Sequence, residues 1–352
     1  MNIYYFANSV YQFSYALPVY NCIGGVFVVR DRKKFYHLKR YMTNMARFNE
    51  KTFRNTPEIK IIPRRELNKL DGVIFFLANS IVPEDDYKNA VTIFHEHGTS
   101  DKKYSGGQSR GGRKLAKYDY IFLSGPKNKE RLTDIGLDIP EEKLIKIGGL
   151  RFDDYVNGKI DREREMDRLK IKDRSRKNIL YAPTWRFGDG TIKKYGFRFA
   201  REITKEYNLI LRPHYHDRRY GAYIHAVSKL KGIKHLYFSQ PANLIKSDTL
   251  FDFAVSDLLI SDISSVIYEY LITLNPMIIV LNEFKQRHNM SDEMNIMKHA
   301  DFYDGSQNIA EIIKENLETQ KYKKDYKVML NSCFYSTDGT CVDKAAEFLE
   351  RL

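Results

Sequence analysis

The chain alternates short apolar runs with longer amphipathic stretches along nearly its whole length. This alternation is typical of α/β folds, in which helices cover a parallel sheet built from the apolar runs. The runs expected to form strands are 25–29, 59–62, 72–77, 91–94, 120–123, 144–147, 178–181, 209–211, 235–238, 258–260 and 277–281. Helices are expected over stretches that include 35–47, 126–134, 197–207 and 264–271.

At 352 residues the chain is longer than a usual single domain. A charged segment, 159–177, contains few apolar residues and is expected to form a solvated helix and linker. We therefore predict two Rossmann-like, doubly wound domains that face a central cleft, over 1–172 and 173–335. A C-terminal helix over 336–352 can pack back on the first domain. Ligands bind such sheets at the carboxyl ends of the strands, so residues directly after strands are the candidates for function.

The composition excludes a disordered chain, because apolar residues make up 43% and aromatic residues 13%. The three cysteines form no C-x-x-C pair and no disulfide framework, which is typical of a reducing compartment. We expect no signal peptide, and the longest apolar stretch, 258–281, is interrupted by polar residues that prevent it from spanning a bilayer. The formal net charge of +13 favours an anionic partner, whether nucleic acid, a membrane surface or a phosphorylated substrate.

In the first half, the segment His95-Glu96-His97-Gly98-Thr99-Ser100 follows a predicted strand. A histidine at a strand end can face a cleft and titrate near neutrality, which suits His97 for a general base. The alternatives are a surface or capping histidine, or a metal site with His95 and His97 as ligands. The metal alternative is the weaker one, since no third ligand is evident nearby.

In the second half, two predicted strands end in cations and hydroxyl groups. Thr184 and Arg186 follow the first of them, and Arg186 offers a planar donor fork suited to phosphate. Arg212 and His214 follow the next strand. Trp185, the only tryptophan, is expected to pack in the core or to close the domain interface.

A further predicted strand runs into Ser261-Asp262-Ile263-Ser264-Ser265 and then into an apolar helix. The unpaired N–H groups and the positive dipole of a helix N-terminus bind anions, so Asp262, Ser264 and Ser265 mark a candidate diphosphate site. Ordinary helix capping by the same residues is the alternative. Glu269 lies one turn into the helix, where its carboxylate can accept hydrogen bonds from ribose hydroxyls.

Together these segments resemble the CDP-glycerol glycerophosphotransferase family of teichoic-acid synthesis, whose members adopt the two-domain GT-B glycosyltransferase fold. The matching segments are His97-Gly98-Thr99, Ser124-Gly125-Pro126, Tyr181–Arg186, Pro213-His214 and Ser261–Ser265. The sequence departs from the family pattern at Ser100, where proline is usual, and at His95-Glu96, where the context is usually aromatic.

The resemblance implies that an acceptor hydroxyl attacks the β-phosphorus of CDP-glycerol and releases CMP. His97 is then the general base, on an acceptor side that includes Gly98, Thr99 and Ser124. The second domain binds the donor and stabilises charge on its diphosphate through His214, Thr184, Arg186, Arg212, Asp262, Ser264 and Ser265, with Glu269 on the ribose. No metal or cofactor is required, because the helix dipole and the cations can neutralise the diphosphate.

The family's acceptors are usually carried on undecaprenyl lipid, so we expect a cytoplasmic protein attached peripherally to the inner face of the membrane. The basic segment 30–34 with Lys39 and Arg40 is the candidate contact to anionic lipid, and a solvated helix face is the alternative. The compact length favours a primase over a polymerase. Transfer from CDP-ribitol, capsule synthesis and the oligomeric state stay open.

Two rival functions differ in chemistry. A GT-B glycosyltransferase with a nucleotide-sugar donor shares the diphosphate site but transfers a sugar. A non-catalytic nucleic-acid binder would interleave aromatic and basic residues on one face, whereas the motifs here fall at strand ends. We therefore expect no nucleic-acid partner.

Overall fold

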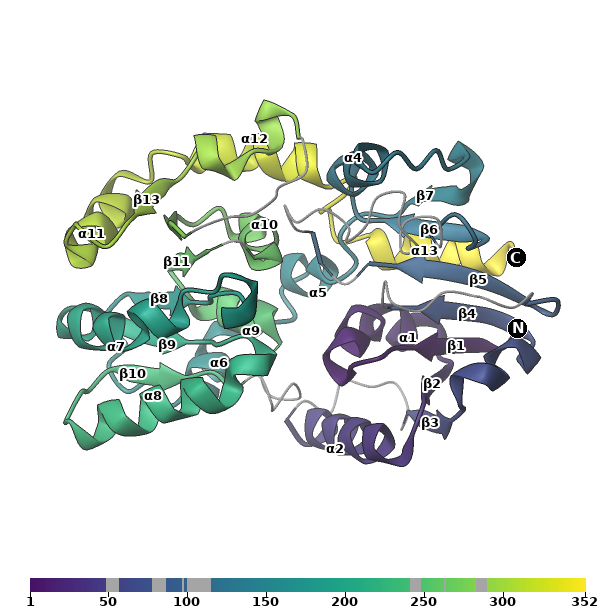
Figure 1. The fold of residues 1–352 in the computed structure, drawn as a ribbon, viewed down its shortest axis with the longest axis horizontal. Coiled ribbons are helices and arrows are strands. Elements are labelled where there is room, and N and C mark those ends of the chain that lie inside the picture. Colours follow the sequence, from purple (N-terminus) through teal and green to yellow (C-terminus); the bar gives the residue numbers. More distant parts are fainter. Residues whose placement is uncertain are drawn as a thin grey trace.

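The computed structural model describes residues 1–48, 57–77, 87–96, 98–99, 115–240, 248–262, 264–282 and 290–352. It contains two α/β domains side by side, each with one parallel sheet (Figure 1). The predicted fold class, two Rossmann-like doubly wound domains, is confirmed by the strand orders of both sheets.

The first sheet has the strand order β3-β2-β1-β4-β5-β6-β7, and every pair of neighbours is parallel. Its strands are β1 (Ile3–Phe6), β2 (Val26–Val29), β3 (Glu58–Ile61), β4 (Gly72–Phe76), β5 (Ala90–His95), β6 (Tyr120–Leu123) and β7 (Leu144–Lys146). The central strand β1 was not predicted. Its four residues are all buried, as is typical of a strand in a parallel sheet covered on both faces.

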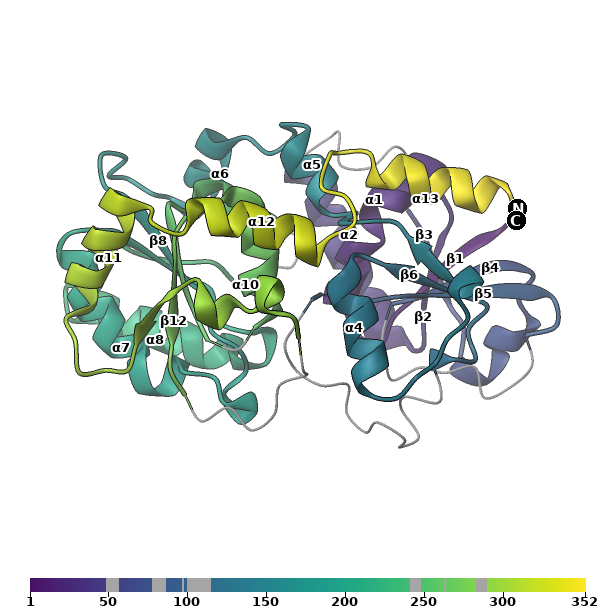
Figure 2. The ribbon, with the colours of Figure 1, turned by 90° about the horizontal axis from the view of Figure 1, so that it is seen from above.

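Helices cover both faces of the first sheet (Figure 2). They are α1 (Leu17–Ile23), α2 (Arg32–Phe48), α4 (Pro126–Asp134) and α13 (Cys341–Glu350). Tyr5 points into the core beneath α1, α2 and α13, whereas its neighbours Tyr4 and Phe6 point into the core beneath α4. The chain therefore returns to the first domain at its C-terminal end, where the Phe348 ring lies 5.0 Å from the Tyr120 ring.

The second sheet has the strand order β10-β9-β8-β11-β12-β13, again entirely parallel. Its strands are β8 (Asn178–Tyr181), β9 (Asn208–Leu211), β10 (Leu236–Phe238), β11 (Leu258–Ser261), β12 (Met277–Val280) and β13 (Asp301–Tyr303). The short edge strand β13 was not predicted. The helices of this half are α5 (Phe152–Val156), α6 (Arg162–Leu169), α7 (Ile192–Glu202), α8 (Arg218–Leu230), α9 (Thr249–Val255), α10 (Ser265–Tyr270), α11 (Ile309–Thr319) and α12 (Lys323–Cys333).

Short 3₁₀ turns connect several of these elements. They are η1 (Val10–Tyr15), η2 (Arg64–Lys69), η3 (Glu141–Lys143), η4 (Arg186–Gly188), η5 (Ile203–Lys205), η6 (Tyr215–Asp217), η7 (Leu271–Thr273), η8 (Asp292–Met294) and η9 (Ile296–Lys298). The predicted helix 197–207 begins earlier than expected, at Ile192, and ends in the turn η5.

The domain boundary differs from the predicted position after residue 172. Leu150 belongs to the core of the first domain, whereas Phe152 and the α6 residues Met166 and Leu169 belong to the core of the second. The charged segment forms the predicted helix as α6, but one face of this helix packs on the second core instead of being solvated. The Arg168 guanidinium pairs with the buried Asp252 at 2.9 Å, which adds an ion pair to the apolar contacts between α6 and α9.

Among the residues that the structure describes, no helix combines the length and the apolar character needed to cross a bilayer.

Candidate functional site

The loop that follows β8 is held by the carboxylate of Asp262, which is completely buried. One Asp262 oxygen accepts a hydrogen bond from the Thr184 amide at 2.7 Å. The other accepts bonds from the amide and the hydroxyl of Thr191, at 2.9 and 2.8 Å. Both oxygens of Asp262 therefore order the loop that carries Thr184, and the carboxylate does not face solvent.

Arg186, in the same loop, is held by a second buried carboxylate. Asp217 accepts bonds from the Arg186 amide at 2.8 Å and pairs with its Nε at 3.2 Å. The Arg186 side chain stays 41% exposed, with its guanidinium 4.7 Å from the centroid of the Phe187 ring. Arg186 is thus oriented by Asp217 while much of its donor fork faces outward. The sequence analysis did not identify Asp217 as a candidate, although this residue lies only three positions after His214 of the Pro213-His214 motif.

Arg212, at the end of β9, lies in a buried ion-pair cluster. Its Nη1 is 2.6 Å from Asp252 and 3.2 Å from the Ser239 hydroxyl. Asp252 also pairs with Arg168, so its two oxygens receive two guanidinium groups. The Arg212 guanidinium is therefore directed at Asp252 rather than at solvent.

His214 begins the turn η6, where its Nδ1 accepts a bond from the His216 amide at 3.3 Å. The His216 ring lies 5.3 Å from the His214 ring and 5.2 Å from the Trp185 ring. Trp185 is 37% exposed, and Phe187 beside it is 71% exposed. The expectation that Trp185 packs in the core is wrong, because it lies on the surface beside residues of its own domain.

The N-terminus of α10 faces the first domain. Ser264 caps the helix, with its hydroxyl accepting a bond from the Val266 amide at 3.4 Å, as the capping alternative predicted. Ser265 lies against Gly98, whose backbone has a φ of +121°. A Cβ atom at Gly98 would be 2.9 Å from the Ser265 hydroxyl oxygen, so a side chain there would require Ser265 to shift. The two motifs, 167 residues apart, are thereby brought into contact (265 minus 98).

The predicted acceptor-side residues line one small cavity between the domains. Gly98, Thr99 and Ser124 share it with Glu269, and its volume is about 30 Å³. That is room for about one water molecule. The cavity therefore places the first-domain motif beside α10, but it has no space for a nucleoside.

Glu269 takes part in an interdomain network, which we define as Tyr15, Arg151, Asp248 and Glu269. One Glu269 oxygen accepts a bond from the Tyr15 hydroxyl at 2.9 Å, and the other pairs with Arg151 Nη1 at 3.0 Å. Arg151 Nη2 binds Asp248. The Arg151 guanidinium also lies 4.3 Å from the centroid of the Tyr15 ring. These contacts connect the first domain to the second.

Burial governs the protonation of this network. Burial raises the pKa of Glu269, and the charge of Arg151 together with the Tyr15 hydrogen bond offsets part of that effect. Burial and the neighbouring Glu269 raise the pKa of Tyr15 well above its usual value, so its hydroxyl remains a donor. Burial disfavours the charged form of Arg151, but Asp248, Tyr15 and Glu269 outweigh it and raise its pKa.

His97 and Ser100 lie outside the described residues, so the base predicted from the sequence is not placed. Its neighbours are. His95 is buried at the end of β5, and Glu96 binds Asn128 and pairs with Arg131 of α4 at 2.6 Å. In the described part of the chain, no group of three or more His, Cys, Asp or Glu side chains is arranged to hold a metal ion.

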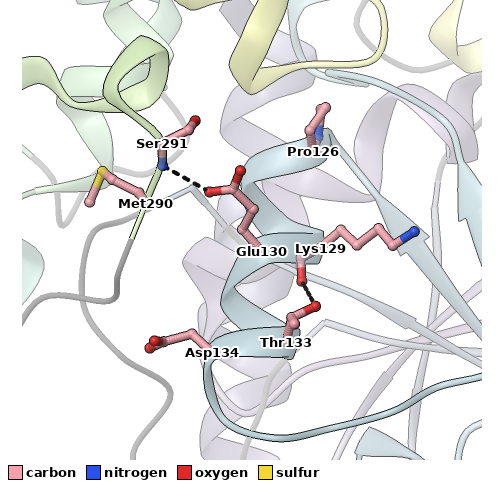
Figure 3. Close-up of a pocket in the computed structure, with 7 residues that line it drawn as sticks. All are labelled: Pro126, Lys129, Glu130, Thr133, Asp134, Met290 and Ser291. Atoms are coloured by element: carbon pink, nitrogen blue, oxygen red, sulfur yellow. Dashed lines mark hydrogen bonds between the residues drawn. The ribbon is translucent and has the colours of Figure 1, made fainter.

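Two larger cavities also lie between the domains. One, of about 520 Å³, is lined by α4 and by Met290 and Ser291, and the Ser291 amide is 3.4 Å from Glu130 (Figure 3). Beside it, the Lys127 ammonium lies 3.9 Å from the centroid of the Tyr268 ring, a cation–π contact across the interface. The other cavity, of about 850 Å³, is bordered by α1, α5 and the start of α9.

Comparison with known proteins identifies a family that this chain resembles. A family model described as CDP-glycerol:poly(glycerophosphate) glycerophosphotransferase matches residues 78–351. The chain is 27% identical over 221 residues to a teichoic acid poly(glycerol phosphate) polymerase of Staphylococcus epidermidis, covering 60% of this chain and 29% of that protein. It is 24% identical over 298 residues to the teichoic acid glycerol-phosphate primase of Bacillus subtilis, covering 79% of this chain and 72% of that protein.

A solved structure agrees on the fold. The wall teichoic acid polymerase TagF superposes with a TM-score of 0.68 at 18% identity, over 99% of this chain and 88% of that one. The chain spans less than a third of the Staphylococcus polymerase that it matches. At this identity the likeness to TagF establishes the two-domain Rossmann-like architecture and nothing finer.

Proposed function

Because the chain belongs to the CDP-glycerol:poly(glycerophosphate) glycerophosphotransferase family, we propose that it transfers glycerol phosphate from CDP-glycerol to an acceptor hydroxyl and releases CMP. The observation that supports this most is the contact between Gly98 and Ser265. It brings the loop expected to activate the hydroxyl against the helix end expected to bind the diphosphate. A transfer reaction needs these two groups within reach of one phosphorus atom.

The donor binds at the carboxyl edge of the second sheet in this proposal. Arg186, oriented by Asp217, offers an exposed donor fork to the diphosphate. Thr184, His214 and the serines at the start of α10 lie at the ends of neighbouring strands. Arg212 and Asp262 act without facing the donor directly. Arg212 contributes its charge, and Asp262 orders the loop that carries Thr184. Catalysis is then mainly positioning and electrostatic stabilisation, as in other phosphoryl transfers.

The hydroxyl is activated from the first domain. His97 accepts the hydroxyl proton, the acceptor oxygen forms a bond to the β-phosphorus, and the bond between that phosphorus and the CMP oxygen breaks. CMP leaves with the electron pair of that bond. Glu96 supports the loop at one end through Arg131, and Thr99 is buried at the other.

The acceptor is an undecaprenyl-linked saccharide or polyol phosphate, with priming favoured over polymerisation, and the protein works in the cytoplasm on the inner face of the membrane. Helix α2 suits contact with anionic lipid. Leu38 is buried on one side, whereas Lys33, Lys39 and Arg40 are exposed together with Tyr36. Each such cation adds roughly 1 kcal/mol of attraction near an anionic surface. Liposome binding that weakens as salt rises supports this attachment, and binding unchanged by salt contradicts it.

The experiment is a nucleotide-release assay with purified protein and a lipid-linked disaccharide acceptor. We expect CMP to appear only when CDP-glycerol and the acceptor are both present, and the acceptor to gain glycerol phosphate. Matched incubations with CDP-ribitol and with UDP-sugars separate the rival donors. Release of UDP from a UDP-sugar, with no CMP from CDP-glycerol, would make the protein a glycosyltransferase instead.

A further inference from the structure

The interdomain network lies where the chain passes from one core to the other. Arg151 stands between Leu150, in the first core, and Phe152, in the second. Tyr15 reaches Arg151 from the first domain, and Glu269 reaches it from α10 of the second. The network therefore connects both domains at the residue that links them.

The contacts in this network are buried, and both Arg151 Nη atoms bind carboxylates. Arg151 is 8% exposed and Glu269 is 5% exposed. Each Glu269 oxygen has a donor, one from Tyr15 and one from Arg151, and the second Arg151 fork nitrogen binds Asp248. Burying charges is unfavourable unless each is paired, and such networks are often retained because they specify one arrangement. This arrangement is that of the two domains relative to each other.

Glu269 has no room for the ribose expected beside it. The adjoining cavity holds about 30 Å³, and both carboxylate oxygens already accept hydrogen bonds. The position of Glu269 on α10 indicates a different role. Ser265 and Glu269 are four residues apart and lie on the same face of the helix, so the network and the Gly98 contact act on one face.

We infer that Tyr15, Arg151 and Glu269 are positioning residues that fix α10 against the Gly98 loop and so set the distance between the activated hydroxyl and the donor phosphorus. This inference rests on the proposed transferase function. It replaces the predicted ribose contact of Glu269 with a role in aligning the two halves of the site.

Steady-state kinetics test the inference through Tyr15→Phe, Glu269→Gln and Arg151→Lys. Tyr303→Phe is the matched control, because Tyr303 is a buried tyrosine of the edge strand β13, far from the network. We expect kcat to fall roughly ten- to a hundredfold in the network variants, since small misplacements of reacting groups have effects of that size. The KM for CDP-glycerol should stay within about twofold, and the control should match the wild type.

A second measurement keeps the inference testable without any turnover. Hydrogen exchange should speed up at the amides of α10 and of residues 98–99 in Tyr15→Phe, and not in Tyr303→Phe. If the wild type releases no CMP, the proposed function fails, while the exchange result still decides whether the network fixes α10.

Two outcomes overturn the inference. A Glu269→Gln protein whose KM for CDP-glycerol rises more than tenfold at unchanged kcat would make Glu269 a donor ligand. Network variants with wild-type kcat, KM and exchange rates would remove any positioning role.

Discussion

The carboxyl edges of the two sheets are built differently. In the second domain, three completely buried aspartates hold the candidate donor residues from within that domain: Asp262 orders the Thr184 loop, Asp217 orients Arg186, and Asp252 pairs with Arg212. In the first domain, Gly98 lies against Ser265 and Glu269, two residues of the other domain. The candidate donor residues are thus held within one domain, whereas the candidate acceptor-side residue Gly98 depends on how the domains meet.

Because of this difference, we expect substitutions in the two regions to have different effects. Changes to the interdomain contacts should lower turnover, because they alter alignment. Changes to the buried aspartates should weaken donor binding, because they alter the shape of the donor site.

Removing the central cation of the interface should have the largest effect. Arg151→Ala leaves two buried carboxylates without their partner, so the free energy of unfolding should fall by about 3–5 kcal/mol. Urea unfolding measures this. The control is Arg162→Ala, whose pair with Asp257 is partly exposed and is expected to contribute below about 1 kcal/mol. Equal losses in both variants would contradict a buried interdomain contribution.

Loss of the Asp262 carboxylate comes next. In Asp262→Ala the buried amides of Thr184 and Thr191 lose their acceptor, at about 1–3 kcal/mol for each unsatisfied group. We expect lower stability and a higher KM for CDP-glycerol. Asp304→Ala is the matched control, because Asp304 caps an exposed turn through Ser306. A normal KM in Asp262→Ala would show that the loop keeps its shape without this carboxylate.

A methyl group at Gly98 tests the contact between the domains. Gly98→Ala combines an unfavourable φ with a clash against Ser265, so kcat should fall more than stability does. Gly136→Ala separates the two effects, since Gly136 has a φ of +69° and open space around it. It should lose about 1–3 kcal/mol of stability from backbone strain at unchanged kcat. A Gly98→Ala enzyme with wild-type kcat would mean that the Gly98–Ser265 approach is not needed.

The smallest expected effect is the rate at which Cys341 is labelled by a thiol reagent. This rate tests whether α13 stays packed on the first domain. Burial, with the nearby Asp153 charge, raises the pKa of Cys341 to about 12. Because the thiolate is the reactive form, Cys341 should stay unlabelled at pH 8, while the less buried Cys22 reacts. The raised pKa contributes stability that is present below the unfolded thiol's pKa and is lost as the pH rises toward 12. Rapid labelling of Cys341 in the native protein would show that α13 detaches readily.

Local sequence patterns predicted most strands and the residues that directly follow them. Such residues can be found from the sequence because ligands bind parallel sheets at the carboxyl ends of the strands, whatever the rest of the fold. Helix α4 was predicted over its observed range, Pro126–Asp134. Strand β1 was missed, although its four buried residues resemble those of predicted strands such as β8. Helix α6 lies before the predicted division after residue 172 but packs in the second core, through the Arg168–Asp252 pair and through apolar contacts.

The interdomain network could not be predicted from the sequence. Tyr15 and Glu269 are 254 residues apart, and Arg151 and Glu269 are 118 apart, so no periodicity or motif connects them. Arg151 comes five residues after the end of β7, behind Gly148-Gly149-Leu150, and is a cation after a strand like Arg186 and Arg212. Sequence reasoning placed Glu269 correctly on the helix, but its partners come from the other domain.

We propose that the second domain binds the donor and that the first domain activates the acceptor hydroxyl. Calorimetric titration of CDP-glycerol into His97→Ala, together with its CMP release, tests this division most directly. We predict a Kd within about twofold of the wild type and a loss of turnover of roughly a hundredfold or more, the scale of general-base catalysis. A Kd weakened tenfold, or turnover retained near the wild-type rate, would contradict it.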